Sequence, residues 1–202
     1  MKNLYASLAA ALALGFATPA MAVPLPYDQP GVENTVQYQF IAASTGEVTA
    51  YFAGSDAGYM NEITLLVNGV ETGIQGLNNQ TSVYGQVLNF GAVTAGDSLV
   101  FKLININPGT IGPFYSDRSM NDGGYNHIFS SAYAGDDKIP AGVFIGFEDL
   151  PRGGDFDYND ERFVFVNVAD VTDVPEPASI ALLMAGVAGL AASRKAKRAR
   201  QA

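Results

Sequence analysis

The sequence predicts an all-β protein, an antiparallel β-sandwich that is jelly-roll-like. Short runs of alternating apolar and polar residues recur about every eight to twelve residues, as they do in sandwich strands. The chain also contains 22 glycines, many beside Asn or Asp, which suits a fold built from tight turns. No stretch of the body shows the periodicity of a helix.

The alternating runs predict strands in chain order over residues 35–41, 47–53, 62–67, 70–74, 83–90, 98–105, 143–147 and 163–168. The first of these is expected to pair with the second through a turn at 44–46. Asn68-Gly69 predicts a tight hairpin, because both residues accept positive φ. Residues 107–142 show little periodicity, and a loop of that length inside a compact domain is usually functional or tied down.

An acidic loop lies within residues 146–168, GFEDLPRGGDFDYNDERFVFVNV. Its carboxylate and amide groups repel one another unless a positive charge lies among them. Ca²⁺ suits such a loop, because it takes six to eight oxygen ligands and tolerates irregular geometry. The expected Ca²⁺ ligands are Glu148, Asp149, Asp155, Asp157, Asn159 and Asp160. The alternative is a solvated acidic turn without an ion.

The acidic loop does not follow the EF-hand pattern. Counted from Asp155, positions one, three and five fit, but position six is Asp160 instead of glycine and position twelve is Val166. A second acidic group lies in the irregular stretch, and it is expected either to fold over the loop and lend ligands or to form ordinary surface turns. Its members are Asp117, Asn121 and Asp122.

Charge and composition narrow the classes of function. The chain carries a net charge of −9, but residues 28–176 hold all 20 acidic residues and only five basic ones, a net charge of −15. Such a body disfavours nucleic acid as a partner and favours cations. There is no cysteine, which excludes disulfides and thiol chemistry. The single histidine, His127, excludes a His-rich zinc site and is expected to be a hydrogen-bonded structural residue.

Both ends of the chain resemble processing signals. Residues 1–22 have the charged start, apolar core and small-x-small cleavage site, ending at Ala22, of a secretory signal peptide. The body is expected over 23–173 as one domain. Residues 174–202 then hold Pro175, Glu176 and Pro177, an apolar segment over 178–192, and a basic end. The apolar segment is short for a spanning helix, and the basic end would stay cytoplasmic, so transient membrane anchoring is expected.

This tail resembles the PEP-CTERM sorting signal of Gram-negative bacteria. The resemblance implies export by the Sec pathway and transient anchoring in the inner membrane. It further implies cleavage by an exosortase near Pro175–Pro177, with delivery to the cell surface or extracellular matrix. That family is associated with exopolysaccharide and biofilm.

The body, through GFEDLPRGGDFDYNDERFVF and SDRSMNDGGYNH, resembles the domain-of-unknown-function 4114 family. This resemblance implies a calcium-binding β domain with no established activity. The sequence departs from the expected pattern at Glu161-Arg162, where an apolar pair would fit.

Three functions follow as hypotheses. The first is an adhesion or matrix protein whose acidic loop binds Ca²⁺, with exopolysaccharide or another matrix component as partner. The second is a polysaccharide hydrolase using carboxylates such as Glu148 and Asp157, but carboxylates within one short loop suit an ion better than a cleft, so no enzyme is expected. The third is an inert matrix component whose loop merely stabilises a hairpin.

Overall fold

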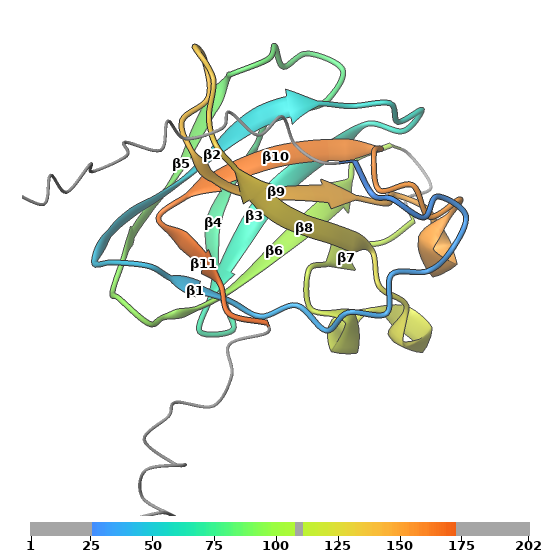
Figure 1. Ribbon diagram of the computed structural model, residues 1–202, viewed down its shortest axis with the longest axis horizontal. Coiled ribbons are helices and arrows are strands. Elements are labelled where there is room, and N and C mark those ends of the chain that lie inside the picture. The colour runs from blue at the N-terminus through green and yellow to red at the C-terminus, as the bar shows by residue number, and fades with distance from the viewer. Residues whose placement is uncertain (1–25, 108–110, 173–202) are drawn as a thin grey trace, which may run out of the picture.

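The computed structural model describes residues 26–107 and 111–172, which form two antiparallel β-sheets stacked face to face (Figure 1). This arrangement confirms the predicted β-sandwich. Several predictions concern segments outside the described residues: the signal peptide 1–22 with Ala22, the processing residues Pro175, Glu176 and Pro177, and the apolar segment 178–192.

One sheet has six strands in the order β11-β1-β6-β3-β4, with β7 beside β6. Their bounds are β1 Phe40–Ala42, β3 Asn61–Val67, β4 Val70–Gly76, β6 Ser98–Asn105, β7 Phe114–Tyr115 and β11 Val168–Asp170. The other sheet has five strands in the order β5-β2-β10-β9-β8. Their bounds are β2 Gly46–Gly54, β5 Val87–Val93, β8 Ile128–Tyr133, β9 Gly142–Phe147 and β10 Glu161–Val166. Three 3-10 turns complete the described elements: η1 Arg118–Met120, η2 Asp122–Gly124 and η3 Pro151–Gly153.

The core lies between the sheets and is built from the inward-facing residues of each strand. Phe163 and Phe165 of β10 and Phe101 of β6 are fully buried. The rings of Phe101 and Phe165 stack across the interface at 3.8 Å between centroids. In β2 and β6 the alternation that predicted the strands places every second side chain in the core.

The Asn68-Gly69 hairpin is confirmed. The two residues have φ of 50° and 80°, and the flanking Val67 and Val70 pair directly. Positive φ at both central positions gives the turn a twist that matches the strands it joins.

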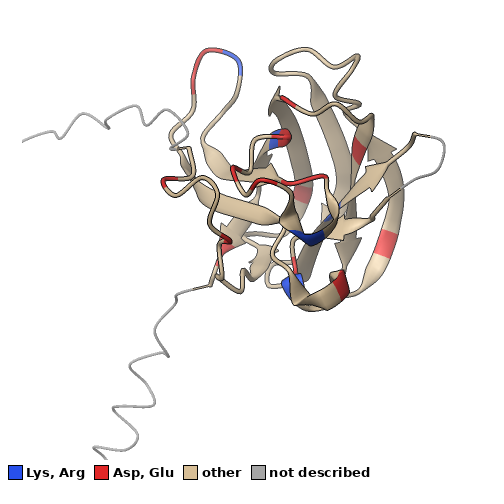
Figure 2. Ribbon diagram, turned by 90° about the vertical axis from the view of Figure 1, so that its right-hand side faces the viewer, with Lys and Arg blue, Asp and Glu red and all other residues tan. Residues whose placement is uncertain are grey.

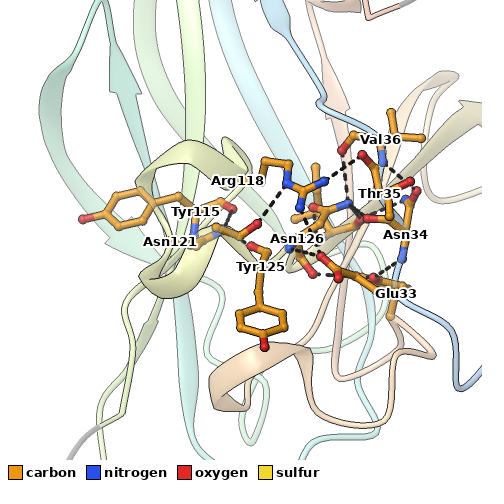
Figure 3. Close-up of polar contacts among 12 residues, drawn as sticks. Glu33, Asn34, Thr35, Val36, Tyr115, Arg118, Asn121, Tyr125 and Asn126 are labelled. Atoms are coloured by element: carbon orange, nitrogen blue, oxygen red, sulfur yellow. Dashed lines mark hydrogen bonds and ion pairs between the residues drawn. The ribbon is translucent and has the colours of Figure 1, made fainter.

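The prediction of a strand over 35–41 is wrong for most of its length, because β1 covers only Phe40–Ala42. β1 also pairs with β11 and β6, whereas the strand expected as its partner lies in the other sheet as β2. In the segment before β1, backbone carbonyl groups accept hydrogen bonds from side chains instead of from a neighbouring strand (Figure 3). Arg118 Nη1 donates to Thr35 O at 2.8 Å, and Asn126 Nδ2 donates to Asn34 O at 2.7 Å.

Two further strand predictions need correction at their ends. β5 begins at Val87 and not at residue 83, because residues 83–86 form a turn in which the Gln86 amide donates to Val83 O. The strand expected over 163–168 is two strands in different sheets, β10 and β11. They are separated by Asn167, whose φ of 65° interrupts the extended chain.

The stretch 107–142, predicted to be irregular, contains two complete strands, β7 and β8. β8 pairs with β9 from Ile128 to Tyr133 and forms one edge of the five-stranded sheet. The stretch thus closes one side of the sheet that carries the acidic loop.

Among the described residues, no helix has the length and apolar character that crossing a membrane requires.

Candidate metal centre

The acidic loop, residues 148–160, joins β9 to β10 inside the five-stranded sheet. The two strands pair in register from Phe147 opposite Glu161 onward, and β8 and β2 flank them. The loop therefore rises from two strands that are each held on both sides, which gives its first and last residues a rigid base.

The backbone of the loop adopts unusual conformations. Arg152, Phe156 and Tyr158 have φ of 64°, 54° and 54°, a region that side chains other than Gly, Asn and Asp seldom occupy. Such strain persists only where the surroundings fix it, and it is common at functional sites. Tyr158 supplies part of that restraint: it is buried, its hydroxyl accepts from the Asn34 amide at 2.8 Å, and its ring meets Tyr27 edge-on.

Neighbouring segments also hold the loop through its backbone. The amide of Gly31 donates to Asp155 O at 3.1 Å, and the amide of Asp56 donates to Asn159 O at 3.2 Å. These contacts come from the segment before β1 and from the connection between β2 and β3. The positions of the acidic side chains are thus set from two sides.

Three of the predicted ligands come together, and we name them the outer carboxylate group: Glu148, Asp155 and Asp157. One carboxylate oxygen from each lies within 4.8 Å of the other two. Glu148 is fully buried, Asp157 is half-buried and Asp155 is exposed, so the group opens to solvent on one side. Asn159 supports it, since its Nδ2 donates to Asp157 Oδ2 at 2.5 Å.

The outer carboxylate group lacks a positive partner. None of the ion pairs among the described residues includes one of its members. One oxygen of Glu148 accepts from the Tyr158 amide, but Oε2 is buried without a hydrogen-bond partner. Burial, together with the charges of Asp160, Asp155 and Asp157, raises the pKa of Glu148 to about 8. Burial likewise raises the pKa of Asp157.

The other two acidic residues that were predicted as ligands, Asp149 and Asp160, lie together with Asn61 and Glu161. We name these four residues the inner carboxylate group. Asn61 Nδ2 donates to Asp149 Oδ2 at 2.7 Å and to Glu161 Oε1 at 3.3 Å. The Asp149 amide donates to Asp160 Oδ2 at 2.9 Å. Burial raises the pKa of Asp160 to about 7 and that of Glu161 to about 9.

Asn61 and Glu161 were not among the predicted ligands. Asn61 is distant in sequence and carries no local motif. Glu161, however, has a recognisable signal, because it is in phase with Phe163 and Phe165 on the core side of β10. An acidic residue at a core-facing strand position is costly unless it is paired or binds an ion.

The side chains of Asp117 and Asn121, in the second acidic group, form hydrogen bonds with residues outside the acidic loop. Asp117 Oδ1 accepts from the Ser119 amide and from Gln37 Nε2, both at 2.9 Å. The side-chain amide of Asn121 bonds to the backbone of Tyr115 and Tyr125 (Figure 3). Asp122 is exposed in η2. None of the three belongs to the outer carboxylate group.

His127 is a structural residue, as predicted. It is buried, its Nδ1 lies 3.1 Å from Glu148 O, and its ring stacks on Phe114 with centroids 4.3 Å apart. Burial lowers its pKa, which favours the neutral ring. His127 thus supports the first residue of the loop through its backbone.

A cavity of about 220 Å³ lies beside the outer carboxylate group. Asp157 and Asn159 form one part of its wall, and Tyr27, Tyr158 and Arg162 line others. Acidic positions clearly outnumber basic ones over the described chain (Figure 2). The site as a whole is a strained, oxygen-rich loop with buried carboxylates, and oxygen is the ligand type that hard cations take.

Fold and loop together define a class: β-sandwich proteins with an acidic loop between two central strands. The PEP-CTERM protein-sorting motif matches residues 173–195, so the chain is an exported protein that Gram-negative bacteria sort with membrane anchoring and exosortase processing. A family model described as "Domain of unknown function (DUF4114)" matches residues 56–167, more than half of the chain. The chain belongs to this family. No curated protein and no solved structure matches it.

Proposed function

We propose that this exported chain is a Ca²⁺-binding β-sandwich that serves adhesion or the structure of an exopolysaccharide matrix at the cell surface or outside the cell. The observation that carries the proposal is the outer carboxylate group. Three carboxylates within 4.8 Å, one of them fully buried, demand a cation or shared protons.

Calcium is the cation that best suits these ligands. All side-chain donors here are oxygens, and the irregular loop offers no octahedral frame of the kind Mg²⁺ demands. Backbone carbonyls, Asn159 and water could complete the six to eight ligands that Ca²⁺ takes. Extracellular modules bind Ca²⁺ with dissociation constants of about 0.1–1 mM. A site with an affinity in this range would be sufficient for an exported protein.

An ion at the outer carboxylate group would join the two arms of the loop. Glu148 precedes η3, whereas Asp155 and Asp157 follow it. Bridging these residues would stabilise a loop conformation that contains three non-glycine residues at positive φ. The ion would also form part of the wall of the adjacent cavity, where Tyr27 offers an aromatic face. A matrix saccharide could meet both there, which supports exopolysaccharide as the partner.

We propose no catalytic role for the loop. The alternative, a polysaccharide hydrolase, needs two carboxyl groups placed on either side of a scissile bond. Here Glu148 and Asp157 belong to the same cluster of three within one loop, which favours an ion. Polysaccharide turnover by the wild type that disappears in Glu148→Gln, with Ca²⁺ binding retained, would support the hydrolase instead.

The test is thermal unfolding of the full chain in detergent, with EDTA, Mg²⁺ or Ca²⁺. We expect a Ca²⁺-specific rise of the midpoint, since a ligand at a hundred times its Kd stabilises the folded state by about 2.7 kcal/mol. Asp157→Asn should reduce the rise. Asp137→Asn, which removes the same charge from an exposed site, should not. Equal midpoints in EDTA and Ca²⁺ would refute calcium binding.

Adhesion is tested separately by co-sedimentation with exopolysaccharide from the producing bacterium. Binding that EDTA abolishes and Ca²⁺ restores is expected for an ion-dependent adhesin. A protein that binds Ca²⁺ but sediments no polysaccharide under either condition would be the inert matrix component.

A further inference from the structure

The inner carboxylate group spans the two sheets of the sandwich. Asn61 is the first residue of β3 in the six-stranded sheet, and Glu161 is the first residue of β10 in the five-stranded sheet. Asp149 follows β9, also in the five-stranded sheet. Asn61 connects them, because its single amide nitrogen donates to both carboxylates.

The hydrogen bonding of this group is incomplete although three of its four members are buried. Asn61 and Glu161 are completely inaccessible to solvent, and Asp149 is 2% exposed. Glu161 receives one long hydrogen bond at Oε1, and its Oε2 has no partner. Asn61 Oδ1 is also buried without a partner. Oxygens that lose water on folding and gain no donor cost free energy, unless a ligand meets them.

Among the described residues, no ion pair includes a carboxylate of this group. Arg162 is next to Glu161 in the chain, but its guanidinium forms its ion pair with Asp56 at 3.2 Å. Asp160 adds a third carboxylate, since its Oδ2 accepts from the Asp149 amide. Adjacent buried carboxylates cannot all be charged without a positive partner.

We propose that the inner carboxylate group is a second divalent-cation site, of the Ca²⁺ class, with the Asp149 and Glu161 carboxylates as ligands. The side-chain amide of Asn61, whose Nδ2 faces both carboxylates, would turn over on binding so that its Oδ1 becomes the third ligand. Asp160 lies at its edge. The site shares no side chain with the outer carboxylate group, so neither proposal depends on the other. Both buried, unpartnered oxygens supply lone pairs to the ion, which links the first residue of β3 to the first residue of β10.

An ion at this position closes one end of the sandwich. β3 and β10 belong to opposing sheets, and the core between these sheets is built mainly from apolar side chains. A cation ligated from both sheets fixes their separation where the acidic loop begins and ends. The inner ion would therefore hold the fold, and the outer ion would remain the accessible one.

The experiment is calorimetric titration of the full chain in detergent with Ca²⁺, after exhaustive removal of divalent ions. We expect two ions per chain in the wild type. Asp157→Asn and Glu161→Gln should each remove a different one, and the double variant should bind none. Glu62→Gln is the matched control, because it removes one acidic charge from the residue beside Asn61 and should keep both ions.

The outcomes separate the two proposals. One ion that survives Glu161→Gln and is lost in Asp157→Asn overturns the inner site alone. One ion that survives Asp157→Asn and is lost in Glu161→Gln overturns the outer site and supports the inner one. If Glu161→Gln does not fold, Asn61→Asp decides: an added carboxylate should tighten one ion about tenfold, and unchanged affinities of both ions would refute the assignment.

Discussion

Single residues determine whether the outer carboxylate group can form, and Gly154 is the clearest case. It ends η3 with φ of 56° and ψ of −123°, which side chains disfavour. A Cβ at this position would lie 2.7 Å from Glu148 Oε2. The absence of a side chain therefore leaves space beside the unpartnered oxygen of the group.

Gly154→Ala is expected to lower the free energy of unfolding by about 1–3 kcal/mol through backbone strain, and also to weaken Ca²⁺ binding, because Glu148 must move. Gly96→Ala is the matched control: Gly96 also has positive φ, but nothing lies within 4 Å of its Cβ position. It should lose stability and keep its Ca²⁺ affinity. Urea unfolding and calcium titration measure the two effects, and equal Ca²⁺ affinities in both variants would contradict this role of Gly154.

The sequence was sufficient to predict most of the acidic side chains of the site. It was not sufficient to predict that they separate into an outer and an inner carboxylate group. The local spacing of Asp155, Asp157 and Asn159 was visible as an ion-binding pattern. Asp149 turned out to face Asn61, which lies 88 positions earlier in the chain. Contacts of that range depend on the stacking of two sheets, and no local pattern encodes them. Only Glu161, in phase with the core phenylalanines, offered a local indication.

Among the elements, the break between β10 and β11 governs how the chain changes sheets. Asn167 takes φ of 65° at this point. Its Oδ1 accepts from the Ser44 amide at 2.8 Å and from Ser44 Oγ at 2.7 Å, and its Nδ2 donates to Ser44 O at 3.0 Å. One side chain thus connects the β10–β11 corner to the β1–β2 corner.

Asn167→Ala is expected to cost about 2–3 kcal/mol of unfolding free energy, since it removes these hydrogen bonds and replaces a residue that tolerates positive φ by one that tolerates it less well. Asn167→Gly loses the same bonds but accepts the backbone conformation. It should recover about 1 kcal/mol of that loss. Chemical denaturation of both variants gives the comparison, and a glycine variant less stable than the alanine variant would argue against the conformational part.

The prediction of strands and turns succeeded where local backbone preferences determine the structure. It failed where contacts with residues distant in the sequence determine it. Asn68-Gly69 determines its hairpin by its own backbone preferences. Residues 35–39 alternate like a strand. However, the side chains of Arg118 and Asn126 bind backbone carbonyl groups in this region, which a neighbouring strand would otherwise bind. The strand β8 was missed because IFSSAY is short and has three small residues in its middle, so its pairing with β9 supplies most of the pattern.

At the scale of the whole molecule, two carboxylate groups at one end of the sandwich make folding sensitive to both protons and cations. Glu148, Asp160 and Glu161 have pKa values raised by burial to about 8, 7 and 9. A carboxyl that binds its proton more tightly in the folded state stabilises that state at low pH. The stabilisation is lost as pH rises through the folded-state pKa.

In EDTA, the free energy of unfolding is therefore expected to fall between about pH 5 and pH 9, by at least about 2 kcal/mol, the scale of one shifted carboxyl. His127, with its lowered pKa, acts in the opposite direction, but only below about pH 6.5. Saturating Ca²⁺ should abolish the fall, because the ion replaces the protons. Glu161→Gln should reduce it in EDTA. Urea titrations across this range measure the effect, and a flat profile without divalent ions would contradict it.

The short strand β11 has a mechanical consequence for an anchored protein. Tension transmitted from the sorting tail would reach the fold first at β11, an edge strand with three residues that pairs, within the described part of the chain, only with β1. β11 would peel away before any other strand carried load. The hydrogen bonds between Asn167 and Ser44 would then resist further separation of the chain before β10 came under load. The acidic loop, at the far end of β10, would be shielded from the pull.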